Sequence, residues 1–181
     1  MNRTRKISLR ELVLFSLFGA MMFVSAQIDI IPNVHQLALF ISVTTMVYRV
    51  KALIPIYLYV FLEGLFGGFG LWWIPYLYIW TVLWALIMLI PKSLNTYVTA
   101  ILITVACALH GICFGIMYAP FQCLLYFKGN FDMMIPWVIS GLPYDVVHML
   151  GNIAASAVAV PLIKLLCSLE GKPVPFGKRE K

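Results

Sequence analysis

Long runs of apolar residues, broken by short polar or glycine- and proline-containing segments, dominate the chain. They cover residues 9–26, 34–50, 52–65, 71–90, 96–118 and 143–166. A transmembrane helix needs about 20 predominantly apolar residues, and residues 34–50 make a short one. The pattern predicts an all-α integral membrane protein, a bundle of six transmembrane helices formed by residues 1–169. Residues 170–181, which contain two prolines and several charges, are expected to form a disordered cytoplasmic tail.

Composition and charge placement agree with a membrane protein. The chain is 62% hydrophobic and 11% charged, whereas soluble domains are about 45–50% apolar and about 25% charged. With six helices and the N-terminus inside, all Lys and Arg residues except Lys128 fall on one side. The positive-inside rule therefore places both termini in the cytoplasm and the protein in the cell membrane. Because these charges sit in short turns and tails, without a basic and aromatic patch, we expect no nucleic acid partner.

The N-terminal segment has a second interpretation. A charged start, an apolar run and Val24-Ser25-Ala26 also resemble a secretory signal peptide with its cleavage site. The apolar run is long for such a peptide, and its removal would leave the other helices without a partner. We expect residues 1–26 to be retained, with cleavage as the alternative.

Polar residues gather on the side opposite the basic turns. Pro143 suits the first position of a helix, and Asp145, His148 and Asn152 would then share one face of that helix. Polar groups inside a membrane are costly and are by default candidates for function. The structural alternatives are that Asp145 caps its own helix and that His148 and Asn152 bond to each other or to a neighbouring helix.

Glu63 is the second candidate, because it precedes a loop rich in glycine and aromatic residues. Trp72, Trp73 and Tyr76 follow in that loop, and Tyr78 and Trp80 come directly after it. This aromatic cluster could equally form an interfacial aromatic belt. Aromatic faces beside carboxylates suit a cationic or heteroaromatic ring. A strongly anionic ligand would need Arg or Lys, and only Lys128 lies on that side. We therefore expect a small cationic, amino or multi-hydroxyl ligand.

Several functions lack their sequence signals. The four cysteines form no C-x-x-C pair and no zinc spacing, which predicts neither a disulfide framework nor a metal site. No G-x-x-x-x-G-K-[ST] segment is present, so the chain is not expected to hydrolyse ATP. Ser16 and Ala20, with Gly19 beside them, have the small-xxx-small spacing that lets membrane helices approach closely.

Together these features resemble the substrate-binding S-component of energy-coupling factor (ECF) vitamin transporters. The resemblance covers nearly the whole chain. It is carried by Ile31-Pro-Asn-Val-His35, by Glu63-Gly-Leu-Phe-Gly-Gly-Phe-Gly-Leu-Trp-Trp-Ile-Pro-Tyr76, and by Gly141-Leu-Pro-Tyr-Asp-Val-Val-His148 with Asn152.

The resemblance implies a binding subunit and not an enzyme. It implies capture of a vitamin-like ligand from outside, followed by delivery through a transmembrane T-component and two cytoplasmic ATPases that supply ATP hydrolysis. The chain itself is expected to bind no cofactor. Helix one of the family contacts the T-component through an Ala-x-x-x-Ala motif, which corresponds here to Ser16 and Ala20. The family's ligand site corresponds to Asn33, His35, Glu63, Trp72, Trp73, Tyr76, His110, Trp137, Asp145, His148 and Asn152.

Two other functions remain open from the sequence. One is a membrane scaffold of the cell envelope with the same fold, since fold does not determine function. The other is an intramembrane enzyme that uses His110, His148 and Asp145 for proton transfer or metal binding. A scaffold would tolerate loss of Asp145 and Glu63, whereas a transporter would lose uptake.

Overall fold

The computed structural model describes residues 7–28 and 34–177, and within them the chain is helical with no strand. This confirms the predicted all-α class. Three short 3-10 helices, η1 (Arg49–Ala52), η2 (Leu71–Trp73) and η3 (Phe131–Met133), connect the α-helices. The α-helices are α1 (Leu9–Gln27), α2 (Leu37–Tyr48), α3 (Leu53–Gly67), α4 (Tyr76–Met88), α5 (Thr96–Ile112), α6 (Phe114–Leu125), α7 (Met134–Ser156) and α8 (Ala159–Leu169).

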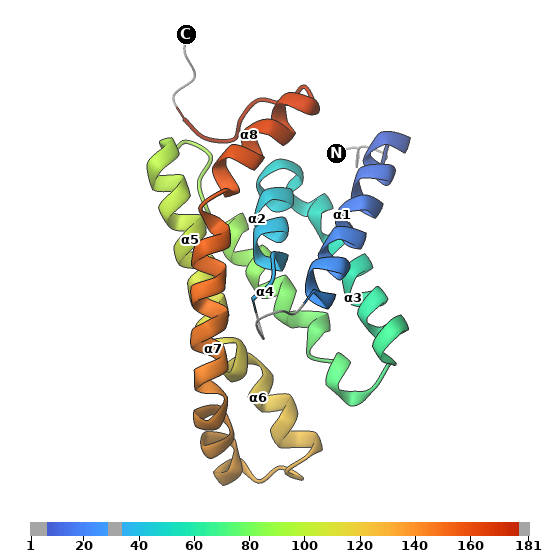
Figure 1. The fold of residues 1–181 in the computed structure, drawn as a ribbon, viewed down its shortest axis with the longest axis vertical. Helices are drawn as coiled ribbons and strands as arrows, with labels where there is room; N and C mark the ends of the chain where they lie inside the picture. The colour runs from blue at the N-terminus through green and yellow to red at the C-terminus, as the bar shows by residue number, and fades with distance from the viewer. Residues whose placement is uncertain (1–6, 29–33, 178–181) are drawn as a thin grey trace, which may run out of the picture.

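Helical segments long and apolar enough to cross a membrane make up most of the described chain. There are five among the described residues: Leu9–Gln27, Leu37–Gly67, Leu71–Met88, Thr96–Leu125 and Phe131–Ser156. The chain turns at η1, so α2 and α3 run in opposite directions within the second segment (Figure 1). With 12 residues, α2 spans about 18 Å, short of the roughly 30 Å hydrocarbon core. Five long apolar helical segments among the described residues are the pattern of a multi-pass membrane protein.

Three helix boundaries differ from the predicted ones. Pro143 does not start a helix, because α7 begins at Met134 and continues through it. Proline has no backbone N–H, so the helical hydrogen bond from position 143 to the Ile139 carbonyl is missing. Membrane helices tolerate such a loss. The expected run 96–118 divides at Cys113, and α6 then continues to Leu125, beyond the predicted end of that run. The run 143–166 divides between α7 and α8.

Ion pairs hold together the end of the molecule where α1 begins and α8 ends, the upper end in Figure 1. Ser8 and Glu11 cap α1, and Glu11 also accepts from Lys51 Nζ at 2.7 Å. Arg10 pairs with Glu170 at 2.9 Å. These contacts join the start of α1, the α2–α3 turn and the end of α8, so charges predicted to share one side do lie at one end.

The tail beyond α8 is ordered as far as it is described, contrary to the expected disorder. Phe176 is buried at 5% exposure, and the Gly177 N–H donates to the Leu94 carbonyl at 2.7 Å. These contacts fold residues 170–177 back over the turn between α4 and α5.

The bundle has a packed interior and an apolar outside. Phe15, Met22 and Leu83 are fully buried in the core, whereas Leu9 and Phe66 are 78% and 72% exposed. Exposed apolar side chains on nearly every helix are what a lipid-facing surface requires. Gly19 brings α1 close to α3, because a Cβ there would lie 2.7 Å from Leu58 Cδ2.

Candidate functional site

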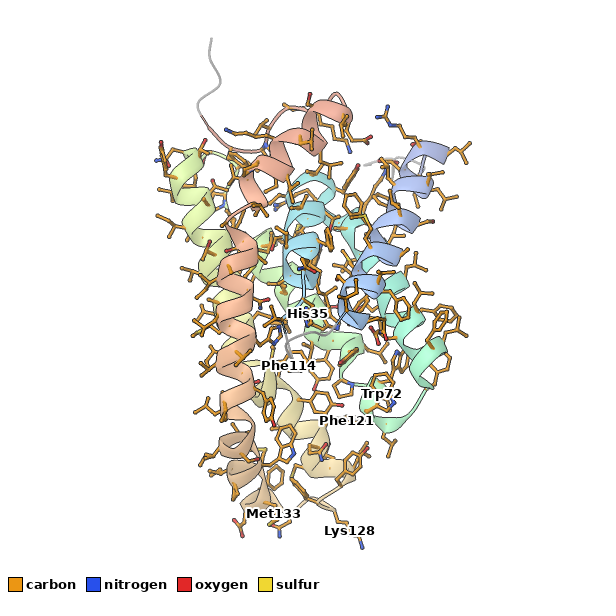
Figure 2. The ribbon with its side chains drawn as sticks, in the orientation of Figure 1. His35, Trp72, Phe114, Phe121, Lys128 and Met133 are labelled. Carbon is orange, nitrogen blue, oxygen red and sulfur yellow. The ribbon has the colours of Figure 1, made fainter. Side chains whose placement is uncertain are left out.

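A small cavity lies where the end of α1 meets the start of α2 and the helices α3, α4, α6 and α7. Its volume is about 160 Å³. Figure 2 labels two of its side chains, His35 and Phe114, near the middle of the molecule, well above Lys128 at the lower end. The lining residues are Ala26, Gln27, His35, Tyr59, Glu63, Tyr76, Trp80, Phe114 and His148.

Glu63 is the acidic residue of this cavity. Its Oε1 accepts from Gln27 Nε2 at 3.2 Å, which joins the end of α1 to α3. Tyr59, one helical turn earlier on α3, also interacts with the carboxylate. Among the described residues, no Lys or Arg lines the cavity. The carboxylate is therefore left with neutral partners and can accept a positively charged or hydrogen-bond-donating group.

Aromatic rings form one wall of the cavity around Trp80. The Trp80 ring lies edge-on to Tyr59 and to Tyr76, each with centroids 5.8 Å apart, and 5.7 Å from Phe114. Trp80 is only 1% exposed, and its indole N–H has no partner within the described structure. A buried unpaired donor costs free energy, so a ligand that accepts from Trp80 Nε1 would be favoured there.

Two histidines line the cavity and a third lies behind it. The ring centroids of His35 and His148 are 5.2 Å apart, and those of His148 and His110 are 6.3 Å apart. His110 Nε2 lies 3.1 Å from the Ile79 carbonyl, so this nitrogen donates and Nδ1 is an acceptor. Neither His110 Nδ1 nor His148 Nε2 has a partner in the part of the chain that is described. No metal-binding group of three or more such side chains occurs within these described residues.

Asp145 does not line the cavity; it caps α6. Its two carboxylate oxygens accept from the Gly115 N–H at 3.2 and 3.1 Å. Gly115 lies in the first turn of α6, where backbone donors lack helical partners and a negative charge suits the helix dipole. A Cβ at position 115 would lie 2.5 Å from Asp145 Oδ2, so only glycine permits this approach. The sequence suggested that Asp145 might cap its own helix, but the capped helix is a different one.

Asn152 joins α7 to α5. Its Nδ2 donates to the Cys107 carbonyl at 3.0 Å, next to Gly111, where a Cβ would lie 2.8 Å from the backbone of Met149. One turn further on, Ser156 Oγ bonds to Thr104 Oγ1 at 2.9 Å. Of the three polar residues predicted to share a face of this helix, only His148 reaches the cavity.

The three tryptophans predicted for the site lie around the cavity. Trp73 Nε1 donates to the Val60 carbonyl at 2.6 Å and fastens η2 to α3. The Trp72 carbonyl accepts from the Tyr118 hydroxyl, and Trp72 stands edge-on to Tyr76 with centroids 5.7 Å apart. Trp137 stacks on Tyr118 at 6.1 Å. None of these three tryptophans is among the lining residues.

Four of the predicted residues therefore meet in the cavity: His35, Glu63, Tyr76 and His148. Asn33 lies outside the described residues. The prediction omitted Tyr59 and included Trp80 only in the aromatic cluster, although each stands four residues from a predicted binding residue, Glu63 and Tyr76, on the same helical face. Gln27 and Phe114 have no local signal, because tertiary packing alone brings them to the site.

The predicted contact surface on α1 is open. Ser16 and Ala20 are both exposed, whereas Gly19 between them is buried. The two small residues therefore face outwards and leave a strip on which another helix could pack closely.

Comparison with protein-family models, curated proteins and solved structures finds no match to this chain. The cavity is therefore the feature that bears on function. Its lining combines a carboxylate, two imidazoles and a wall of aromatic rings, which can hold a small polar ring. Within the described part of the chain, the lining offers no fixed positive charge to an anion.

Proposed function

We propose that the protein is the substrate-binding subunit of an ECF-type importer, an S-component, in the cell membrane. Its ligand is a small water-soluble vitamin or related micronutrient with a cationic, amino or multi-hydroxyl ring. One observation carries the proposal: Glu63 lies in an aromatic-walled cavity that no lysine or arginine lines among the described residues.

The physical basis is charge complementarity in a partly buried site. Opposite unit charges about 4 Å apart attract by about 4 kcal/mol at an effective dielectric constant of 20. A cation over the face of Trp80 or Tyr76 gains about 0.5–2 kcal/mol more. The unpaired Trp80 N–H and His148 Nε2 add directional hydrogen bonds, which select a ring with polar groups on its edge.

Import also needs partners, and the chain offers a surface for one. The sequence has no phosphate-binding loop for ATP, so two ATPase subunits and a transmembrane T-component supply the energy. The exposed Ser16 and Ala20 on α1 suit close contact with a helix of that component. The basic residues at the opposite end support an orientation in which that end faces the cytoplasm and the half of the molecule that holds the cavity faces outward.

Native mass spectrometry of the detergent-purified full chain, followed by titration with a panel of vitamins, tests the proposal. We expect a co-purified small molecule, and tighter binding of cationic or hydroxylated rings than of anionic vitamins. Glu63→Gln should weaken binding by about 100-fold, because a charge-assisted contact of about 1.5–3 kcal/mol is lost. Asp132→Asn is the matched control, since Asp132 is exposed and lies outside the cavity.

Three results would count against the proposal. Nanomolar binding of an anionic vitamin with no binding of cationic ones would exclude the ligand class. Unchanged ligand binding in Glu63→Gln would exclude the cavity as the ligand-binding site. Turnover of the bound molecule by the isolated chain would indicate an enzyme instead.

A further inference from the structure

A second pocket lies at the opposite, basic end of the molecule. It has a volume of about 270 Å³ and is formed where the tail folds over the ends of α2 and α4. Two lysines line it: Lys92, which follows α4, and Lys172, in the tail. The other lining residues include Met46, Val47 and Val174.

Positive charge is in excess at this pocket. Lys51 forms an ion pair with Glu11 at 2.7 Å, and Arg10 forms one with Glu170 at 2.9 Å. Lys172 reaches the same Glu170 only at 3.8 Å, with its Nζ 3.8 Å from the centre of the Tyr48 ring. Lys92 has no ion-pair partner among the described residues. One carboxylate is thus shared by two cations, and the pocket can take another negative group.

An apolar groove begins next to this pocket. It runs between α4 and α5, has a volume of about 220 Å³, and is lined by Leu86, Leu89, Pro91, Leu102, Val105 and Leu109. Pro91 lines the groove and the next residue, Lys92, lines the pocket, so the two linings meet at these neighbouring residues. The groove lies along two helical segments that are long enough to cross the bilayer, so an acyl chain that enters it would run along the helix axes.

We propose that an anionic phospholipid binds here, with its phosphate between Lys92 and Lys172 and one acyl chain in the α4–α5 groove. Lysines at a membrane surface attract anionic headgroups, each contributing about fivefold in affinity. The adjoining apolar groove favours a lipid over a free phosphate ion, because only a lipid fills both spaces. This site is separate from the ligand cavity and does not depend on the importer proposal.

The test is lipid retention by the full chain. Protein reconstituted with mixed phosphatidylglycerol and phosphatidylcholine is analysed by native mass spectrometry after stepwise delipidation. We expect one phosphatidylglycerol to be retained about tenfold longer than phosphatidylcholine. Lys92→Gln should lower this preference about fivefold, and Lys164→Gln, an exposed lysine on α8 outside the pocket, should leave it unchanged.

The groove has its own pair of variants. Val105→Trp fills the groove and should shorten lipid retention, whereas Ile101→Trp changes an exposed α5 position that does not line it. Equal retention of both lipids, or equal effects of Lys92→Gln and Lys164→Gln, would overturn the proposal. So would binding of inorganic phosphate that competes with the lipid while Val105→Trp has no effect, because the site would then hold free phosphate only.

Discussion

The polar residues of α7 belong to two regions that differ in how their atoms are paired. At the cavity, His148 Nε2 and the neighbouring Trp80 N–H have no partner within the described structure. At the contact with α5 and α6, Asp145 accepts from Gly115. Asn152 donates through Nδ2 to the Cys107 carbonyl, and only its Oδ1 has no partner among the described residues of this contact. Both regions are buried and both lie on one helix face, so burial alone does not tell them apart.

The difference shows that unpaired polar atoms on a membrane helix indicate a site only where they border a cavity, because a ligand can reach them only there. A polar group in lipid must find a partner, because an unpaired one is costly. Where a neighbouring helix supplies that partner, the residue stabilises the fold. Where atoms remain unpaired around a cavity, a ligand can supply the missing partner.

Loss of the α6 cap should have the largest effect on stability. Asp145→Ala leaves the Gly115 N–H unpaired at the start of α6 and removes a charge-assisted bond, which should cost about 2–4 kcal/mol of unfolding free energy. Ligand affinity of the folded fraction should stay within about threefold. Unfolding in detergent and ligand titration measure the two quantities, and Asp132→Ala, an exposed acid, is the control. A large loss of affinity with unchanged stability would place Asp145 in the binding site.

The two tryptophans Trp80 and Trp73 give the sharpest paired test. Trp80→Phe removes the unpaired indole N–H and should weaken ligand binding by about tenfold, equivalent to one hydrogen bond of about 1.4 kcal/mol. Trp73→Phe removes a bond to the Val60 carbonyl and should lower stability by about 1 kcal/mol with little change in affinity. Ligand titration and unfolding of both variants measure these two effects. An affinity loss in Trp73→Phe with none in Trp80→Phe would contradict the proposed difference between the two tryptophans.

The smallest effect is expected at Asn152. Asn152→Ala removes its bond to the Cys107 carbonyl, which lies within a helix, and should cost about 1 kcal/mol of unfolding free energy. Ligand affinity should not change measurably. An affinity loss as large as that of Glu63→Gln would show that Asn152 reaches the ligand, and isothermal titration with unfolding in parallel distinguishes these outcomes.

The sequence predicted the helical class and the one-sided basic residues well, because both follow from local features. Apolar length predicts helices long enough to cross a membrane. The grouping of Arg10 and Lys51 follows from the alternating direction of the helices, and the structure confirms it through their ion pairs at one end.

The helix boundaries and the hydrogen-bond partners of the buried polar side chains were harder to predict, because they depend on contacts between residues distant in sequence. The break between α5 and α6 at Cys113 is stabilised by Asp145, 30 residues beyond Gly115. No local sequence pattern predicts such a cap. Pro143 is a good helix start by local preference, but Asn130 caps η3 and η3 leads directly into α7. For the site, helical periodicity alone would have added Tyr59 and Trp80 to Glu63 and Tyr76.

The contact between Gly115 and Asp145 has a consequence for how this protein can evolve. With a Cβ at position 115 only 2.5 Å from the carboxylate, position 115 cannot gain a side chain while Asp145 stays in place. A lineage that gains a side chain at 115 must shorten residue 145, and α6 then needs a new cap from elsewhere. These two positions should therefore change together among descendants of this sequence, as a correlated pair and not as two independent sites.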